Sequence, residues 1–184
     1  MDSTPERPVW TTSTLARSTW SDSHIFGKPH ATEYDSSATS DTTVGNTDGV
    51  TYYYEHETGV NQIKDGAGTA IAASIESGDF DISRTQQGGA DIRGDGEYIM
   101  KIRRVLPDFL QQTGDARVTL NLKNYPTDSQ ASSSLGPFTT TTTTDKIDTR
   151  ARARAISLKV DNTSTGQHWK LGTFRLDIQP DGRR

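Results

Sequence analysis

Residues 148–160, DTRARARAISLKV, and, after a short polar turn, residues 168–184, HWKLGTFRLDIQPDGRR, read as two β-strands. Both segments alternate polar and apolar residues with a period of two, which is typical of half-buried strands. In the first segment the even positions are arginines up to Arg154 and apolar from Ile156, so one strand face begins charged and ends in a core. In the second, the apolar positions change parity across Gly172, which predicts a β-bulge with a positive φ at that glycine.

Charge divides the chain into two unequal parts. Residues 146–184 carry nine Lys/Arg and four Asp, a net charge of +5, whereas residues 1–145 carry eleven Lys/Arg and twenty Asp/Glu, a net charge of −9. The two parts can neutralise each other within one chain or between chains. With a net charge of −4 and a pI near 5.5, the chain lacks the general basic character of a DNA-binding protein.

Composition limits the fold and the chemistry. The chain has 184 residues, 30% of them hydrophobic, and no cysteine. This length suits one domain, and the low hydrophobic content predicts a core that is thin or completed by neighbouring chains. Disulfides, thiolate nucleophiles and Cys-ligated zinc are excluded. No apolar run approaches the roughly 18 residues of a membrane span, and the start MDSTPERPVW lacks a basic and apolar leader. We therefore expect a soluble, non-secreted protein with no membrane partner.

The period of two recurs elsewhere in the chain. It is clearest where Val118, Leu120 and Leu122 alternate with polar residues. Less regular strands are predicted over residues 51–57, 71–77, 98–106 and 138–144. No segment predicts an amphipathic helix longer than a couple of turns. The sequence thus predicts a mainly β fold of antiparallel sheets, sandwich-like or propeller-blade-like.

Two stretches rich in Ser, Thr and Asp show no periodicity. We expect residues 1–16 to form an extended N-terminal arm and the region near 31–49 to form a long loop. Residues 17–184 are then predicted to be a single β domain.

The candidate catalytic patterns are weak. Glu55 and Glu57 could project from one strand face like paired carboxylates, but such a pair is more often a solvated face. The four histidines show no metal-ligand spacing: His24, His30, His56 and His168. Asp-Gly sequences at residues 65–68 and 94–97 are ordinary hairpin turns, and no serine lies in a GxSxG motif. We therefore expect a non-enzymatic protein without a cofactor or metal.

Four segments, in this order, resemble the C-terminal part of tail hub or nozzle proteins of short-tailed phages, also described as packaged-DNA stabilisation proteins. The segments are ESGDFDI (76–82), IRRVLPDF (102–109), KIDTRARARAISLKV (146–160) and WKLGTFRLDIQPDGRR (169–184). The resemblance covers roughly residues 9–184 and implies a mostly β protein, with propeller-like sheets, that assembles as a ring below the portal.

This chain departs from the family in its length. Family members are usually several times longer, with propeller blades ahead of this region. Two interpretations stay open: a hub divided between this chain and a separately encoded hub chain, or a shortened relative that forms its own ring.

Several residues are candidates for a subunit interface. Trp10 and Trp20 lie in polar sequence and suit anchors that dock on a neighbour. The charged candidates are Arg150, Arg152, Arg154, Arg175, Asp177, Arg183 and Arg184, and Arg103 and Arg104 belong to the same set of basic residues. Spacing by two places three guanidinium groups on one strand face, where they could meet phosphates. We favour pairing with carboxylates of a neighbouring subunit because the rest of the chain is acidic and arginine forks suit carboxylates.

The expected function is that of a virion structural protein. The partners would be other copies in a ring and neighbouring connector, portal or tail proteins, with DNA passing nearby but not specifically bound. The expected location is the tail or connector of a virion assembled in the host cytoplasm. The alternative is a carbohydrate- or host-receptor-binding β-sandwich in which the tyrosines at 52–54 stack on sugars.

Overall fold

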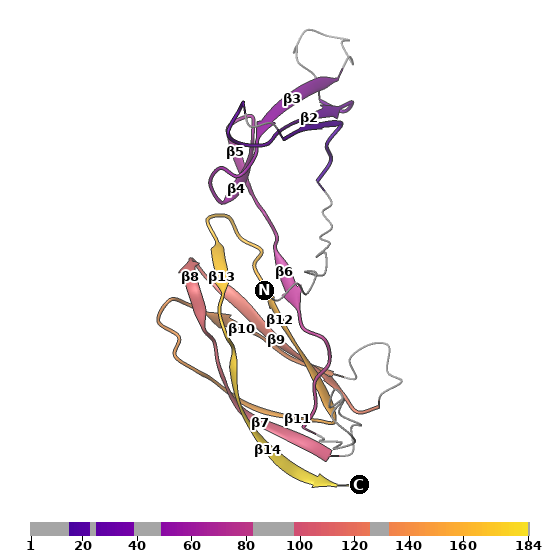
Figure 1. The fold of residues 1–184 in the computed structure, drawn as a ribbon, viewed down its shortest axis with the longest axis vertical. Coiled ribbons are helices and arrows are strands. Elements are labelled where there is room, and N and C mark those ends of the chain that lie inside the picture. Colours follow the sequence, from indigo (N-terminus) through magenta and orange to yellow (C-terminus); the bar gives the residue numbers. More distant parts are fainter. Residues whose placement is uncertain (1–14, 23–24, 39–48, 83–97, 126–132, 184) are drawn as a thin grey trace, which may run out of the picture. The chain divides into compact units, whose positions relative to one another are not determined.

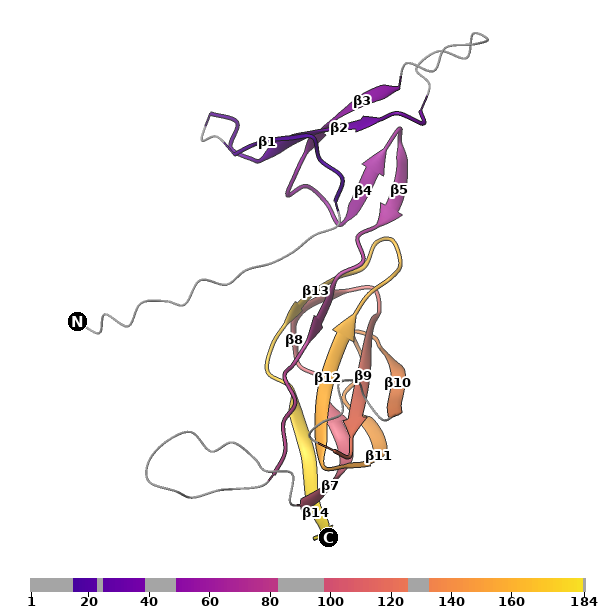
Figure 2. The ribbon, with the colours of Figure 1, turned by 90° about the vertical axis from the view of Figure 1, so that its right-hand side faces the viewer.

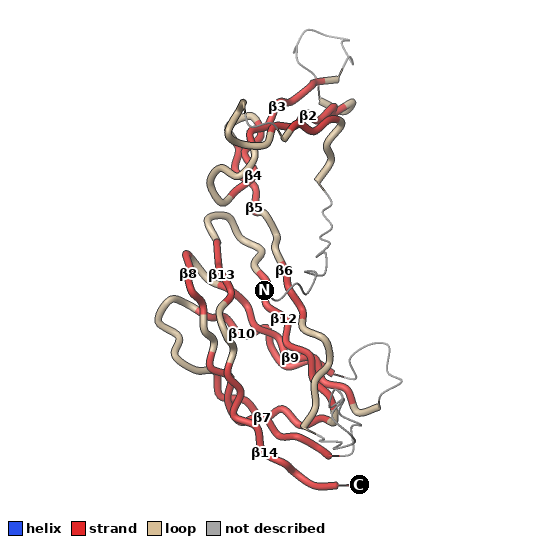
Figure 3. The backbone as a smooth tube through the Cα atoms, in the orientation of Figure 1, coloured by secondary structure: helices blue, strands red, loops and turns tan. Residues whose placement is uncertain are grey.

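The computed structural model describes residues 15–22, 25–38, 49–82, 98–125 and 133–183. These residues form fourteen β-strands and no helix, and all pairings between the strands are antiparallel. Figure 3 shows the described backbone as strands joined by loops. The prediction of a mainly β, antiparallel fold is confirmed. Since the described residues contain no helix, none can cross a membrane as one.

The chain divides into two compact units, Met1–Gly59 (unit 1) and Val60–Arg184 (unit 2). This differs from the single domain predicted over residues 17–184. The β pattern continues through the boundary, so the sequence does not mark it, but the cluster of buried apolar residues is built from unit 2 alone. The predicted arm lies mostly outside the described residues, which begin with Leu15 and Ala16 ahead of the first strand.

Unit 1 is a three-stranded sheet in the order β1-β2-β3. Its strands are β1 (Thr19–Ser21), β2 (His30–Asp35) and β3 (Val50–Glu55). Strand β2 occupies the start of the region expected to be a long loop near 31–49, so that expectation is wrong for residues 31–35. The six residues HATEYD contain little apolar alternation. They form a strand because they pair along their whole length with the tyrosine-rich β3.

Unit 2 is a sandwich of two sheets that face each other across an apolar core (Figures 1 and 2). One sheet has the order β10-β9-β12-β6 and the other β11-β7-β14. The first contains β6 (Ser74–Glu76), β9 (Ala116–Lys123), β10 (Ser133–Thr140) and β12 (Ala155–Asp161). The second contains β7 (Tyr98–Leu106), β11 (Ile147–Ala153) and β14 (Arg175–Arg183). A hairpin of β4 (Asn61–Lys64) and β5 (Ala67–Ala70) precedes them.

The core lies between β7 and β11 on one side and β9 and β12 on the other. Strand β9 alternates buried and half-buried residues throughout, as its sequence predicts. Met100, Ile102, Leu120 and Ile156 are all fully buried. Full burial of such side chains contributes about 1.5–3 kcal/mol each, so this cluster is the main source of stability in unit 2.

The segment 148–160 forms two strands rather than one. Strand β11 ends at Ala153 and β12 begins at Ala155, and the two belong to different sheets. Arg154 stands at the corner, where its backbone N–H donates to the carbonyl of Lys123 at 3.1 Å. Crossing to the other sheet changes which parity faces inward. Ala151 and Ala153 point into the core before the corner, and Ile156 and Val160 do so after it.

A second break explains the parity change near Gly172. Strands β7 and β8 (Phe109–Thr113) pair respectively with β14 and β13 (His168–Leu171). Gly172 lies between the end of β13 and the start of β14. Its N–H donates to the carbonyl of Asp108 at 2.8 Å. Its φ is not positive, so that part of the prediction is wrong. Glycine suits the site because an added Cβ would lie 2.7 Å from that same carbonyl oxygen.

The Asp-Gly turn expected at residues 65–68 is confirmed. Asp65 and Gly66 join β4 to β5 and have φ values of 51° and 75°. Two consecutive residues with positive φ are the signature of a type I′ hairpin turn. The second Asp-Gly turn, at residues 94–97, lies outside the described residues.

Hydrogen bonds of the buried Asn162 hold the segment before β6 against the sandwich. Asn162 is 3% exposed, and its Nδ2 donates to the carbonyl of Ile71 at 3.0 Å. Its backbone N–H donates to the carbonyl of Ala73 at 3.1 Å, and its Oδ1 accepts from Trp169 Nε1 at 3.0 Å. These bonds satisfy the buried amide and hold residues 71–73 beside the end of β12.

Candidate interaction surface

The outer face of the sheet β11-β7-β14 gathers basic side chains. On β7 and β11 buried apolar residues fill the inward positions, and the residues between them point to solvent. Irregular pairing of β7 between Ile102 and Arg104 places Arg103 and Arg104 on the same side. We call these outward residues the basic face: Lys101, Arg103, Arg104, Arg150 and Arg152. The pairing register places Arg152 opposite Lys101, and Arg104 between Asp148 and Asp177. Residues from three separate stretches of sequence therefore share one surface.

Part of this charge is neutralised within the chain. Arg104 Nε donates to Asp148 Oδ1 at 3.1 Å, and Arg152 Nε pairs with the carboxylate of Asp181. The hydrogen bond from Arg104 is the main cause of a lowered pKa of Asp148; Lys146 also lowers it, and burial opposes the shift. The aspartate between these cations therefore stays ionised to lower pH than an ordinary aspartate.

Other cations of the basic face have no such neutralisation. The side chains of Arg103 and Arg150 are exposed, and neither side chain makes an ion pair or hydrogen bond with another described residue. Lys101, half-buried between the two partner strands, also has no ion pair with the described part of the chain. The face is thus a positively charged surface that its own aspartates balance only in part.

The remaining predicted interface residues lie away from the arginines of β11 or outside the described residues. Arg154 stands at the corner between the sheets, so the stripe on β11 consists of Arg150 and Arg152 only. Arg175 begins β14 and approaches Asp108, with 3.9 Å between Nη2 and Oδ2. Asp177 lies on β14 opposite Arg104. Arg183 is the last residue of β14, and Arg184 and Trp10 lie outside the described residues. Trp20 belongs to unit 1.

The outer face of the other sheet, β10-β9-β12-β6, also carries charged side chains, but there they have partners within the chain. Arg117 makes a bidentate pair with Asp161, at 2.7 Å and 2.9 Å. Lys123 Nζ lies 2.6 Å from Asp79 Oδ2. Glu76 accepts hydrogen bonds from Ser157 and from Asn121, both at 2.7 Å, and these bonds lower its pKa. On this face each of these charges has a partner within the chain.

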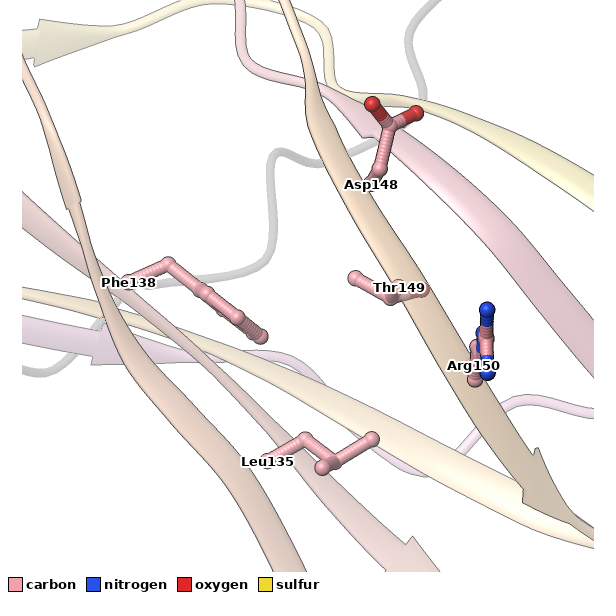
Figure 4. A pocket seen from close by; sticks show the side chains of 5 residues that line it. All are labelled: Leu135, Phe138, Asp148, Thr149 and Arg150. Carbon is pink, nitrogen blue, oxygen red and sulfur yellow. The ribbon is translucent and has the colours of Figure 1, made fainter.

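A shallow hollow of about 360 Å³ lies between β10 and β11, the edge strands of the two sheets. Leu135 and Phe138 line it from β10, and Asp148, Thr149 and Arg150 from β11, as Figure 4 shows. The apolar side chains of Leu135 and Phe138 therefore lie next to the edge of the basic face.

Among the described residues no group of three or more His, Asp or Glu side chains could hold a metal ion.

Unit 1 carries a second concentration of candidate residues, whose contacts with one another are not marked by a local sequence pattern. The three tyrosines of β3 do not form one platform: Tyr54 is buried, while Tyr53 points to the opposite face and is 66% exposed. Tyr53 stacks on His30, with ring centroids 5.2 Å apart, and its hydroxyl lies 2.7 Å from His30 Nδ1. Phe26 packs edge-on against His30, with centroids 5.0 Å apart.

The other face of the same sheet is covered by the chain's own arginine. The guanidinium of Arg17 lies 4.0 Å above the ring of Tyr54, and its Nη1 pairs with Glu33 Oε2 at 2.8 Å. Arg17 Nε donates to His56 Nε2 at 3.3 Å. Burial is the main cause of a lowered pKa of His56, and the Arg17 charge adds to the effect. Trp20 packs on His56, with ring centroids 4.5 Å apart.

Glu55 and Glu57 do not form a carboxylate pair on a strand. Glu55 is the last residue of β3 and pairs with Lys28 at 3.0 Å. Glu57 follows in a turn with φ of 58°.

Comparison with protein-family models, with curated proteins and with solved structures finds no match to this chain.

Proposed function

We propose that the protein is a non-enzymatic virion structural protein of a tailed phage, a subunit of a ring in the head-to-tail connector or tail hub. The ordered resemblance of four segments to tail hub proteins points in this direction, and three of the segments contribute to the basic face or to its flanking carboxylates. The partners are other copies of the chain and neighbouring connector, portal or tail proteins.

One observation carries this proposal: the side chains of Arg103 and Arg150 are exposed on the sheet, and neither pairs with a carboxylate of the described residues. The opposite face of the same sandwich neutralises its own charges. A face with unneutralised positive charge suits an interface with an acidic surface of another subunit, because electrostatic complementarity selects the partner and its orientation. Arginine is also enriched in the energetically important parts of interfaces.

The test is the assembly state of the full-length protein. We expect the wild type to form a closed oligomer, measured by light scattering and seen as rings by electron microscopy, and to bind duplex DNA weakly at physiological salt. Combining Arg103→Glu with Arg150→Glu should leave a folded monomer, because both substitutions reverse charge at positions without an internal partner. The matched control is Lys170→Glu, an exposed lysine on β13 outside the basic face, which should still assemble.

Two results would contradict the proposal. The first is a wild type that stays monomeric at high concentration. The second is strong, salt-sensitive DNA binding by the wild type together with intact rings of the double variant, which would make the basic face a lining for DNA.

A carbohydrate- or receptor-binding module is the second candidate. The observation that favours it is Tyr53, an exposed ring held flat against His30, since aromatic rings with a polar edge suit recognition surfaces. A glycan array probed with wild type and Tyr53→Ala decides this candidate. Binding that disappears in the variant would support it, and the absence of glycan binding by the wild type would reject carbohydrate recognition.

A further inference from the structure

The sheet of unit 1 has two faces of related composition, but only one is covered. On the covered face, Arg17 lies over Tyr54 and pairs with Glu33. Its side chain is 9% exposed. Arg17 therefore shows how this sheet accommodates an arginine: a tyrosine ring beneath the guanidinium and a carboxylate beside it.

The second face presents the same types of residue to solvent. We call it the aromatic face: Phe26, His30, Tyr34, Tyr53 and Glu55. Phe26, Tyr34 and Tyr53 are 58%, 56% and 66% exposed. The pairing register places Glu55 opposite His30, so the carboxylate lies on the side that carries Tyr53. Exposed aromatic clusters of this kind are a mark of interaction sites.

Charge favours an arginine-rich partner for this face. The described residues of unit 1 carry two Lys/Arg and five Asp/Glu, a net charge of −3. Over its whole sequence unit 1 has three Lys/Arg and nine Asp/Glu, whereas unit 2 has seventeen Lys/Arg and fifteen Asp/Glu. The basic face of unit 2 carries arginines without a partner among the described residues. The two surfaces are complementary in charge, and tyrosine rings attract guanidinium groups.

We infer that the aromatic face of one copy receives the basic face of a second copy, so that subunits join head to tail. This inference rests on the proposed function and specifies its interface. A head-to-tail contact uses two different surfaces of each chain, and it produces a closed ring when the rotation between subunits closes. Arg103 or Arg150 of one copy would then lie over Tyr53 of the next, as Arg17 lies over Tyr54. There the arginine would share the carboxylate of Glu55 with Lys28, which pairs with it at 3.0 Å.

The first experiment compares two tyrosines that are equally exposed. Tyr53→Ala should lower the association constant of the full-length protein about thirtyfold, as expected for a tyrosine at the centre of an interface. Tyr125→Ala, at the other 66% exposed tyrosine, should change it less than about twofold. Circular dichroism checks that both variants keep their β structure. If the wild type assembles and Tyr53→Ala assembles equally well, the inference is wrong and the proposed function stands. If the wild type itself is monomeric, the proposed function fails.

The second experiment separates contacts between chains from a contact within one chain. One variant combines Tyr53→Ala with Glu55→Lys, and the other combines Arg103→Glu with Arg150→Glu. Each alone should be monomeric. Mixed in equal amounts, they should form a dimer that contains one of each, because each retains the surface that the other has lost. A mixture that stays monomeric would overturn the inference.

Discussion

Units 1 and 2 are both small antiparallel β structures, yet they are stabilised in different ways. Unit 2 closes two sheets over fully buried side chains such as Ile102, Leu120 and Ile156. In the described part of unit 1, Ala31 and Tyr54 are the only buried apolar residues. Its sheet is held by specific pairs between polar and aromatic side chains. The difference indicates that burial of apolar side chains contributes more to the stability of unit 2 than to that of the described part of unit 1.

The largest expected effect is in the core of unit 2. Leu120→Ala should lower the free energy of unfolding by about 2–5 kcal/mol, because it removes a fully buried side chain and leaves a cavity. The matched control is Leu110→Ala, a leucine that is 69% exposed in β8 and should change stability by less than about 0.5 kcal/mol. Urea denaturation followed by circular dichroism measures both. Equal losses in the two variants would mean that the sandwich does not depend on this core.

A smaller effect is expected at the break between β13 and β14. Gly172→Ala should cost about 1–3 kcal/mol, because the new Cβ would lie 2.7 Å from the carbonyl oxygen of Asp108 and strain the backbone hydrogen bond there. Gly78→Ala is the control, since a Cβ at that glycine meets nothing within 4 Å. The thermal midpoint of each variant gives the answer. If the Gly172 variant has a thermal midpoint as high as that of the control, the close approach of Gly172 to the Asp108 carbonyl does not contribute to stability.

The smallest effect concerns the pH response of unit 1. Burial and the Arg17 charge lower the pKa of His56 in the folded state. The unfolded chain therefore binds a proton more readily, and the stability of unit 1 is fully present above the ordinary histidine pKa of 6.5 and declines as pH falls through the folded value. The protection of the β2 and β3 amides against hydrogen exchange, measured as the observed rate relative to the intrinsic rate at each pH, should fall on acidification from pH 8 to 5.

Histidine variants isolate this response. His56→Gln should remove most of the pH dependence in that interval, whereas His168→Gln, in β13 of unit 2, should leave it in place. An unchanged response in the His56 variant would assign the pH dependence of unit 1 to another group.

The sequence predicted the parts of the fold that depend on local alternation. Strand β7 covers the residues expected of it and ends before Pro107, and β9 alternates as its sequence indicates. The corner at Arg154 was not predicted, because the inward parity changes when a strand crosses to another sheet and a continuous run of residues does not mark the crossing. The sequence predicts a loop where β2 lies, because β2 is stabilised by its pairing with β3 and has no apolar pattern of its own.

The candidate site was predicted only in part for the same reason. The arginines of β11 are visible as a stripe in the sequence, and Arg103 can be grouped with them by its charge. That Arg103 lies on the same sheet follows only from the pairing of β7 with β11. The contacts of Tyr53 with His30 and of Arg17 with Tyr54 join residues that are 23 and 37 positions apart. Such contacts depend on strand register, which local composition does not determine.

The bonds of Asn162 also have a consequence for the order of folding. They join residues 71–73 to the end of β12 across about 90 positions of the chain, whereas β9 and β10 are neighbours in sequence. Closing a longer loop costs more conformational entropy, so near-neighbour contacts are favoured to form first. The hairpin β9–β10 can therefore provide the surface on which β12 pairs. Strand β6 then pairs with β12 as the last strand of that sheet, and the buried side-chain amide of Asn162 holds the residues just before it.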